Sequence, residues 1–331
     1  MTAPRFASLL QRFFTDRLLG QLDASPHTVG SYRDTFRLLL RFATAHLGHA
    51  QSDLRIEALD ALFLGQLLEH LEVERHNGAL TRNTRLSALH AFFRYVALDE
   101  PALALQCQRV LAMPAKRYQR GPVEFLTQEE TAALIAAPNT RTWIGRRDRV
   151  LLLVASETGL SNSELTSLRR QDVELGCGAH VRCLGKGRKT RCTPVRAEVV
   201  AVLKAWLSER GGDAADAVFP SVRGGRLSAD AVQGLVGRYV ATARLACPSL
   251  SAKTVTPHTL RHGTAMELLR RGIDLTVIAL WLGHESTETT QIYLHADMRL
   301  KERALAHANP SGLVPDRYRP PDALVTFLES L

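Results

Sequence analysis

Five polar residues near the C-terminal end have types and spacings that suit chemistry on an anion. His258, Arg261 and His262 are three and one residues apart, so a helix would carry them on one face. His284 follows a later glycine, and Tyr293 comes nine residues after it. An arginine is always protonated and its planar fork can bond two oxygens, while a phenolate is a competent nucleophile. The set could therefore bind an oxyanion and attack it.

Each of these residues also has an ordinary structural explanation. A His-x-x-Arg pair on a helix is most often part of a solvated face, and a lone tyrosine on an amphipathic helix usually packs in a core. His258 and His262 could suggest a metal pair, but no acidic or cysteine ligand follows at a suitable spacing. The combination of residues therefore carries the argument, and no single one does.

The series HxxRH, then LGH, then a tyrosine resembles the tyrosine recombinase (phage integrase) family. The resemblance implies site-specific DNA recombination through a 3′-phosphotyrosyl intermediate, with Tyr293 as the nucleophile. It also implies that Arg261, His258 and His284 bond the phosphate oxygens, and His258 can help to move the tyrosine proton. A covalent enzyme–phosphate link would conserve the energy of the phosphodiester during strand transfer.

An earlier stretch continues the resemblance and departs from it at one position. The family pattern is TGLR-x-SEL and this chain has TGLSNSEL, so Ser161 stands where the family has an arginine that grips the scissile phosphate. Glu164 keeps its place as a supporting residue, and Asn162 or Ser163 is expected to cap the short helix. Lys186 lies in the GKG turn of a predicted hairpin, where the resemblance implies that it protonates the departing 5′-oxygen.

Ser161 leaves three explanations open. The chain could be a deliberately weakened variant, or a natural paralogue that binds DNA but cuts poorly. A nearby arginine, Arg169 or Arg170, could also substitute, although both fall at the far end of the short helix. Loss of an arginine that stabilises phosphoryl charge can cost roughly 10³–10⁵ in rate. Two alternative functions stay open. The first is a non-catalytic DNA-binding or architectural relative. The second is a type IB topoisomerase, which is disfavoured because a core-binding bundle and an exchangeable C-terminal tail point to a synaptic assembly.

The length of 331 residues predicts two domains. Residues 1–112 contain four or five amphipathic helical segments, which predict a compact bundle and resemble the core-binding, DNA-binding domain of the family. Residues 113–125 form a basic linker whose prolines discourage helix. The catalytic domain is expected over 126–331. Its last helix, near 321–331, either packs on its own domain or exchanges onto a neighbouring protomer.

The predicted fold is mainly α with a small antiparallel β-sheet: a helical, SAM-like core-binding domain and a mixed α/β catalytic domain. The sheet comes from a hairpin over 180–184 and 190–195, which alternates around a glycine-rich turn. A capping box at Thr127 opens the catalytic domain. Thr256 caps the helix of the HxxRH motif, with Pro257 at its first position.

The net charge of +9 and the isoelectric point of about 9.7 favour a polyanionic partner. The resemblance implies double-stranded DNA, bound by a homo-oligomer with a dimer per site and a tetramer at synapsis, and binding that weakens steeply with salt. Any single arginine could equally be part of a solvated face. The predicted DNA-contact residues are all basic: Arg33, Arg82, Arg85, Lys116, Arg117, Arg120 and Arg188.

Neither a cofactor nor a metal is expected. Cationic side chains can stabilise the phosphate charge, and the chain shows no dense Asp/Glu cluster typical of a two-metal nuclease. No run of about 18 apolar residues suggests a membrane span. The five cysteines form no CxxC and predict reduced thiols. The expected protein is therefore a bacterial, cytoplasmic and nucleoid-associated one that acts in the recombination, integration or transposition of a mobile element.

Overall fold

The computed structural model describes residues 6–48, 50, 53–118, 123–185, 189–284 and 288–296, without the side chains of 288, 295 and 296. The chain divides into two compact units, Met1–Arg120 and Gly121–Leu331, which are treated separately below. Within the described ranges, no helix is long and apolar enough to cross a membrane.

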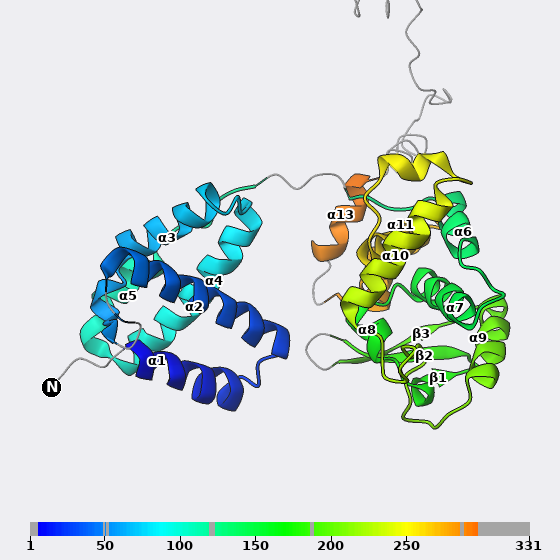
Figure 1. Ribbon diagram of the computed structural model, residues 1–331, viewed down its shortest axis with the longest axis horizontal. Coiled ribbons are helices and arrows are strands. Elements are labelled where there is room, and N and C mark those ends of the chain that lie inside the picture. Colours follow the sequence, from blue (N-terminus) through cyan, green and yellow to red (C-terminus); the bar gives the residue numbers. More distant parts are fainter. Residues whose placement is uncertain are drawn as a thin grey trace, which may run out of the picture. The chain divides into compact units, whose positions relative to one another are not determined.

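The first unit is a bundle of helices, which confirms the predicted helical domain (Figure 1). Ser25 opens its longest helix: the hydroxyl accepts the Thr28 N–H at 3.2 Å, and Pro26 occupies the first helical position. The elements are α1 (Phe6–Arg12), a π-helical segment (Phe13–Gln21), α2 (Pro26–Leu47), a 3₁₀ turn (Ile56–Ala58), α3 (Ala61–Val73), α4 (Ala79–Asp99), a second 3₁₀ turn (Pro101–Leu103) and α5 (Ala104–Leu111).

An aromatic cluster fills the centre of this bundle. The ring of Phe92 on α4 lies edge-on to those of Phe6, Phe13 and Phe36, with centroids 5.6, 5.4 and 5.2 Å away. All four side chains are almost fully buried. Edge-to-face rings add a specific attraction to the apolar area that they bury, so one residue ties the N-terminal helices to α4.

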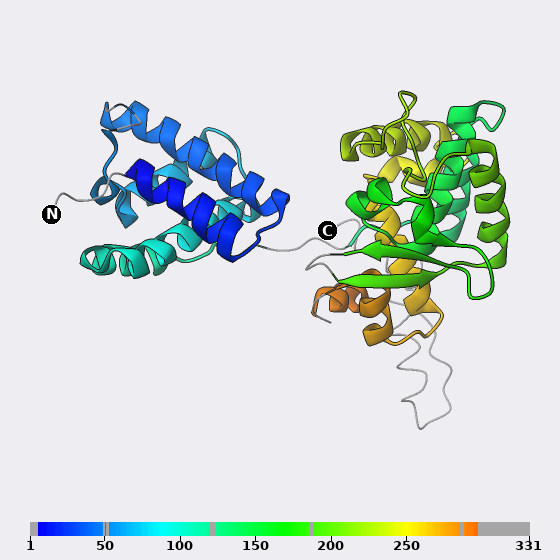
Figure 2. The same ribbon diagram turned by 90° about the horizontal axis from the view of Figure 1, so that it is seen from below.

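The second unit combines helices with one small sheet (Figures 1 and 2). Its helices are α6 (Gln128–Ala136), α7 (Trp143–Thr158), α8 (Asn162–Ser167), α9 (Ala197–Arg210), α10 (Ala229–Ala243), α11 (Pro257–Arg270), α12 (Leu275–Leu282) and α13 (Glu288–Ala296), with 3₁₀ turns at Arg170–Asp172 and Pro248–Ala252. Its strands are β1 (Val173–Glu174), β2 (His180–Leu184) and β3 (Thr190–Pro194). Thr127 forms the predicted capping box at α6.

The sheet is antiparallel in the order β1-β2-β3, which confirms the predicted class. The hairpin pairs His180 with Pro194 and Leu184 with Thr190. The short strand β1 was not predicted, because two residues are too few to show alternation. The tip of the hairpin, 186–188, lies outside the described residues.

Helix α11 is the element against which the others are placed. It packs along α7 and also contacts α12 and α13, while α12 contacts β3. Thr256 caps it and Pro257 begins it, as predicted. Gly159 ends α7 and Gly283 ends α12, both in the left-handed conformation that glycine tolerates best. Two helices therefore end beside α11.

We predict that Phe92→Ala lowers the free energy of unfolding of the first unit by about 3–5 kcal/mol, because it empties the centre of the aromatic cluster. Hydrogen exchange of the α1–α5 amides under mild denaturant measures the loss. Leu98→Ala is the matched control on the same helix, since Leu98 is 76% exposed, and it should change stability by less than about 0.5 kcal/mol. Equal effects of the two variants would contradict the prediction.

Candidate active site

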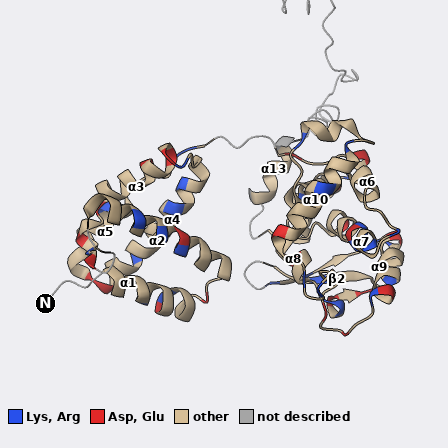
Figure 3. Ribbon diagram, in the orientation of Figure 1, with Lys and Arg blue, Asp and Glu red and all other residues tan. Residues whose placement is uncertain are grey.

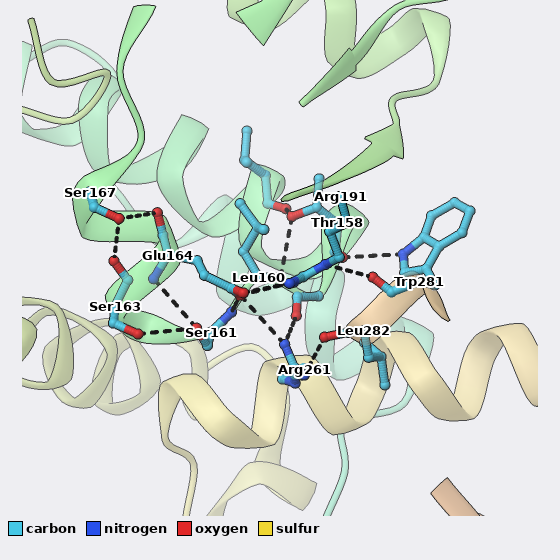
Figure 4. A network of polar contacts seen from close by, with 12 residues as sticks. Thr158, Leu160, Ser161, Ser163, Glu164, Ser167, Arg191, Arg261, Trp281 and Leu282 are labelled. Atoms are coloured by element: carbon cyan, nitrogen blue, oxygen red, sulfur yellow. Dashed lines mark hydrogen bonds and ion pairs between the residues drawn. The ribbon is translucent and has the colours of Figure 1, made fainter. Parts of the chain in front are cut away.

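Arg261 on α11 is fixed between two helix ends. One Nη donates to the carbonyl of Gly159 at 2.8 Å, and the other donates to the carbonyl of Leu282 at 2.5 Å (Figure 4). The side chain is only 9% exposed. The C-terminal ends of α7 and α12 carry unpaired carbonyls with partial negative charge, so they suit a guanidinium. The arginine is held before any ligand arrives.

Tyr293 on α13 is almost completely buried. Its ring packs in a small core with Met266 from α11 and with Ile278 and Leu282 from α12. Its hydroxyl lies 2.8 Å from Nδ1 of His262. Burial raises the pKa of Tyr293 to about 12, and nearby Arg261 only partly opposes this. The phenol is therefore protonated at neutral pH in this arrangement.

Three histidines surround the phenol and the guanidinium. The His258 and His262 rings are 4.2 Å apart, and the His284 ring stacks 6.5 Å from that of Tyr293. Desolvation, helped by the charge of Arg261, lowers the pKa of all three, to about 4 for His262 and about 4 for His284. These last two imidazoles are neutral at pH 7. His284 is oriented by Thr290, whose hydroxyl lies 2.8 Å from Nδ1.

Ser161 is the N-cap of α8. Its hydroxyl accepts the Glu164 N–H at 3.4 Å, and its own N–H donates to the Glu164 carboxylate at 2.7 Å, which completes a capping box. The prediction that Asn162 or Ser163 caps this helix was therefore wrong. The cap position requires extended backbone, and Ser161 is the residue that adopts it.

Arg191 on β3 pairs with the same carboxylate (Figure 4). Its two Nη atoms lie 2.5 and 2.9 Å from the Glu164 oxygens, and its Nε donates to the carbonyl of Trp281 at 3.0 Å. Burial alone would raise the pKa of Glu164, but the hydrogen bonds and charge of Arg191 and the hydrogen bonds from Ser161 together outweigh it, so the pKa is lowered. Arg261 Nη1 lies 3.6 Å from Glu164 as well. One carboxylate thus serves two arginines.

The structure brings together most of the predicted site residues and adds two that the sequence reasoning did not assign. Tyr293, Arg261, His258, His284 and Glu164 converge from α8, α11, α13 and the end of α12, with Ser161 beside them. Lys186 lies outside the described residues. The additions are His262 and Arg191. The HxxRH spacing placed His262 on the right face, whereas only the alternation of β3 hinted at Arg191.

The predicted DNA-contact residues differ in exposure and in their hydrogen-bond partners. Arg82 is 9% exposed and donates to the carbonyl of Pro114, and Arg85 donates to Ser31 and Thr35 on α2. Both arginines thus form hydrogen bonds within the first unit, and their contact with DNA stays a prediction.

Basic residues nevertheless recur along α2 and α4 (Figure 3). Arg33 and Arg117 are exposed, while Lys116 is exposed but paired with Glu72 at 2.8 Å. Arg120 and Arg188 lie outside the described residues.

Arg170 does not reach the site as a replacement for the arginine missing at position 161, because it donates to the carbonyls of Leu207 and Gly211 at the end of α9. The exposed Arg169 pairs through its backbone with Asp172 and Ala217, and its substitution for the missing arginine stays a prediction.

Comparison with known proteins decides the family. Residues 124–299 match the Phage integrase family, and residues 10–99 match the Phage integrase, N-terminal SAM-like domain. The chain belongs to the phage integrase family of tyrosine recombinases. The resemblance inferred from HxxRH, LGH and the tyrosine is thereby confirmed, as is the predicted pairing of a SAM-like domain with a catalytic domain.

Several relatives within the family match almost the whole chain. A putative integrase/recombinase, y4rC, of Sinorhizobium fredii is 50% identical over 98% of both chains. The tyrosine recombinase XerC of Pelobacter propionicus is 32% identical over 92% of this chain and 96% of its own.

Solved structures agree in fold. A Tn1549 transposon integrase in complex with transposon right end DNA has a TM-score of 0.67 at 16% identity, covering 90% of this chain and 98% of that one. A XerH recombinase in a post-cleavage complex with a difH substrate has a TM-score of 0.66 at 22% identity, covering 86% and 80%.

The buried histidines predict how the stability of this recombinase unit depends on pH. The pKa of His262 is about 4 in the folded state and 6.5 ordinarily, so the unfolded chain binds more protons between these values. Stability should be full above pH 6.5 and fall as the pH drops towards 4. All three tryptophans, Trp143, Trp206 and Trp281, lie in the second unit, so their fluorescence during thermal unfolding reports that unit.

His262→Gln should flatten this pH dependence because it removes one of the titrating groups. His27→Gln is the matched control, since His27 is exposed and belongs to the first unit. An unchanged slope in His262→Gln would contradict the buried, neutral state of that imidazole.

Proposed function

We propose that this chain is a site-specific recombinase that cleaves and rejoins double-stranded DNA through a 3′-phosphotyrosyl link to Tyr293. The observation that carries the proposal is the convergence of a buried phenol from α13, an arginine and two histidines from α11, and a third histidine after α12. Membership of the tyrosine recombinase family supports the same reaction class. Tyr293 would attack the phosphorus, and the 5′-oxygen would leave.

The phenol has to lose its proton as it attacks, because a neutral phenol is a weak nucleophile. Nδ1 of His262 lies 2.8 Å from the hydroxyl, so this imidazole is positioned to accept that proton. The sequence suggests His258 for this step, but the imidazole beside the Tyr293 hydroxyl is that of His262, and the His258 ring packs against the His262 ring. Lys186, which lies outside the described residues, is the proposed proton donor to the 5′-oxygen.

Charge on the non-bridging oxygens grows during the attack and must be stabilised. Arg261 is already oriented by two carbonyls, so it stabilises this charge without reorganisation. His258 and His284 would add donors to the same oxygens.

Ser161 explains why we propose a weakened enzyme. A hydroxyl that caps a helix offers no positive charge, whereas the family pattern has an arginine at this position. Loss of one preorganised donor costs roughly 10²–10³ in rate. An engineered and a natural origin of the serine predict the same chemistry.

DNA binding is proposed to use both units, with homodimers on each site and a tetramer at synapsis. The excess of basic residues gives a net charge of +9 that favours a polyanion. Among the candidates in the described ranges, Arg33, Lys116 and Arg117 are the exposed ones. The proposed exchange helix, 321–331, lies outside the described residues. Affinity should fall steeply between 50 and 200 mM salt, on the order of 10³-fold if about six phosphates are contacted.

We predict that Ser161→Arg raises the rate of covalent adduct formation by roughly 10²-fold or more. The substrate is a nicked duplex carrying the sequence that the chain selects from a random library, and a denaturing gel measures the adduct. Tyr293→Phe should abolish the adduct in either background. Ser208→Arg is the matched control: it adds the same charge to an exposed position of α9 in the same unit and should leave the rate unchanged.

The same Ser161→Arg substitution should lower the free energy of unfolding of the second unit by about 1 kcal/mol, because it removes the helix cap. Chemical denaturation followed by tryptophan fluorescence measures this loss. A stable and faster Ser161→Arg variant would show that the cap contributes nothing.

The second candidate is a DNA-binding or architectural relative that no longer cleaves, and Ser161 is the observation that favours it. It predicts sequence-specific, salt-dependent binding by every variant and no adduct even with Ser161→Arg. If Ser161→Arg forms a Tyr293-dependent adduct and the parent chain does not, the serine alone accounts for the lost activity.

A further inference from the structure

The guanidinium groups of Arg191 and Arg261 share the carboxylate of Glu164. Glu164 bonds both Nη atoms of Arg191 and lies 3.6 Å from Arg261 (Figure 4). The side chains of Arg191 and Arg261 are 11% and 9% exposed. One negative charge offsets only one of the two positive charges, and the histidines beside them do not add a negative one. A nearly buried excess of positive charge calls for an anion.

The guanidinium of Arg191 lies where two proposed catalytic side chains begin. A Cβ added to Gly283 would lie 2.6 Å from its Nη1, and one added to Gly185 would lie 3.0 Å from the same atom. Gly283 directly precedes His284, and Gly185 directly precedes Lys186. Arg191 therefore lies close to two glycines that each directly precede, in the chain, a residue proposed to act on the phosphate.

Ser161 belongs to the same cluster, because its N–H donates to the Glu164 carboxylate at 2.7 Å. The position of the missing arginine, Arg191 and Arg261 are thus arranged around one carboxylate. The guanidinium of Arg191, which comes from β3, therefore lies close to the position where the family arginine is replaced by the uncharged Ser161.

We propose, on the basis of the proposed function, that Arg191 supplies the second guanidinium that residue 161 does not provide to the scissile phosphate. Within the described residues, three of its five N–H groups are used, on Trp281 and on the two oxygens of Glu164. One N–H on each Nη is left for a phosphate oxygen. Arg191 remains bound to Glu164 while it does so, and the compensation is therefore partial.

A double-mutant cycle tests this proposal. The parent chain, Ser161→Arg, Arg191→Met and the double variant are compared for the single-turnover rate of adduct formation on the nicked duplex selected above. Arg191→Met should slow the parent roughly 10²–10³-fold, but slow the Ser161→Arg background less than about tenfold, since the charge is then supplied from position 161. Equal losses in both backgrounds would mean that Arg191 only positions Glu164 and would overturn the proposal.

A change of substrate provides the second readout. A methylphosphonate at the scissile position lacks one charged oxygen and needs less positive charge from the protein. The defect of Arg191→Met should shrink to less than about tenfold on this substrate, whereas a structural defect would persist and overturn the proposal.

Two controls keep these readings distinct. Arg191→Met leaves the Glu164 carboxylate without its main partner, so Glu164→Gln combined with Arg191→Met repeats both assays with that charge removed, and thermal unfolding checks that each variant folds. If no variant forms a Tyr293-dependent adduct, Ser161→Arg included, the proposed function itself fails and this proposal falls with it.

Discussion

The Glu164 carboxylate is the point at which three parts of the second unit are held together. It accepts the N–H of Ser161 at the start of α8, pairs with Arg191 on β3 and lies beside Arg261 on α11. Without it, two neighbouring guanidinium groups would be buried with no counter-charge, which typically costs several kcal/mol. The sheet, the short helix and the central helix of the site therefore depend on one side chain.

Backbone polarity extends this arrangement outwards from Arg261. The guanidinium bonds the carbonyls of Gly159 and Leu282, which end α7 and α12. Trp281 adds to the same junction, because its indole N–H donates to the carbonyl of Thr158 and its own carbonyl accepts from Arg191. Helix ends that would otherwise need water are satisfied by cations, so the charge of the site and the packing of its helices stabilise each other.

Features coded by neighbouring residues could be predicted from the sequence, and features that need long-range contacts could not. The helix caps at Ser25, Thr127 and Thr256 depend only on the residue types at the cap and in the first turn that follows it. Arg191 lies 27 residues from Glu164, and His262 lies 31 from Tyr293, so no local pattern links them.

Amphipathic spacing likewise cannot tell a buried Arg82 from an exposed arginine, because the apolar stem of arginine suits either place. The family pattern presents Ser161 as a missing arginine, and this comparison does not reveal that the serine caps α8.

The burial of Tyr293 has a consequence for how the protein searches a genome. A hydroxyl that is enclosed in a core and bonded to His262 cannot meet a phosphorus atom in line. In the proposed reaction, binding to random duplex, which electrostatic attraction favours, would therefore be a separate step from cutting it. If Tyr293 is the nucleophile, as proposed, cleavage requires a rearrangement that exposes the phenol, and the free-energy cost of that rearrangement would protect DNA that is bound but is not a recombination site.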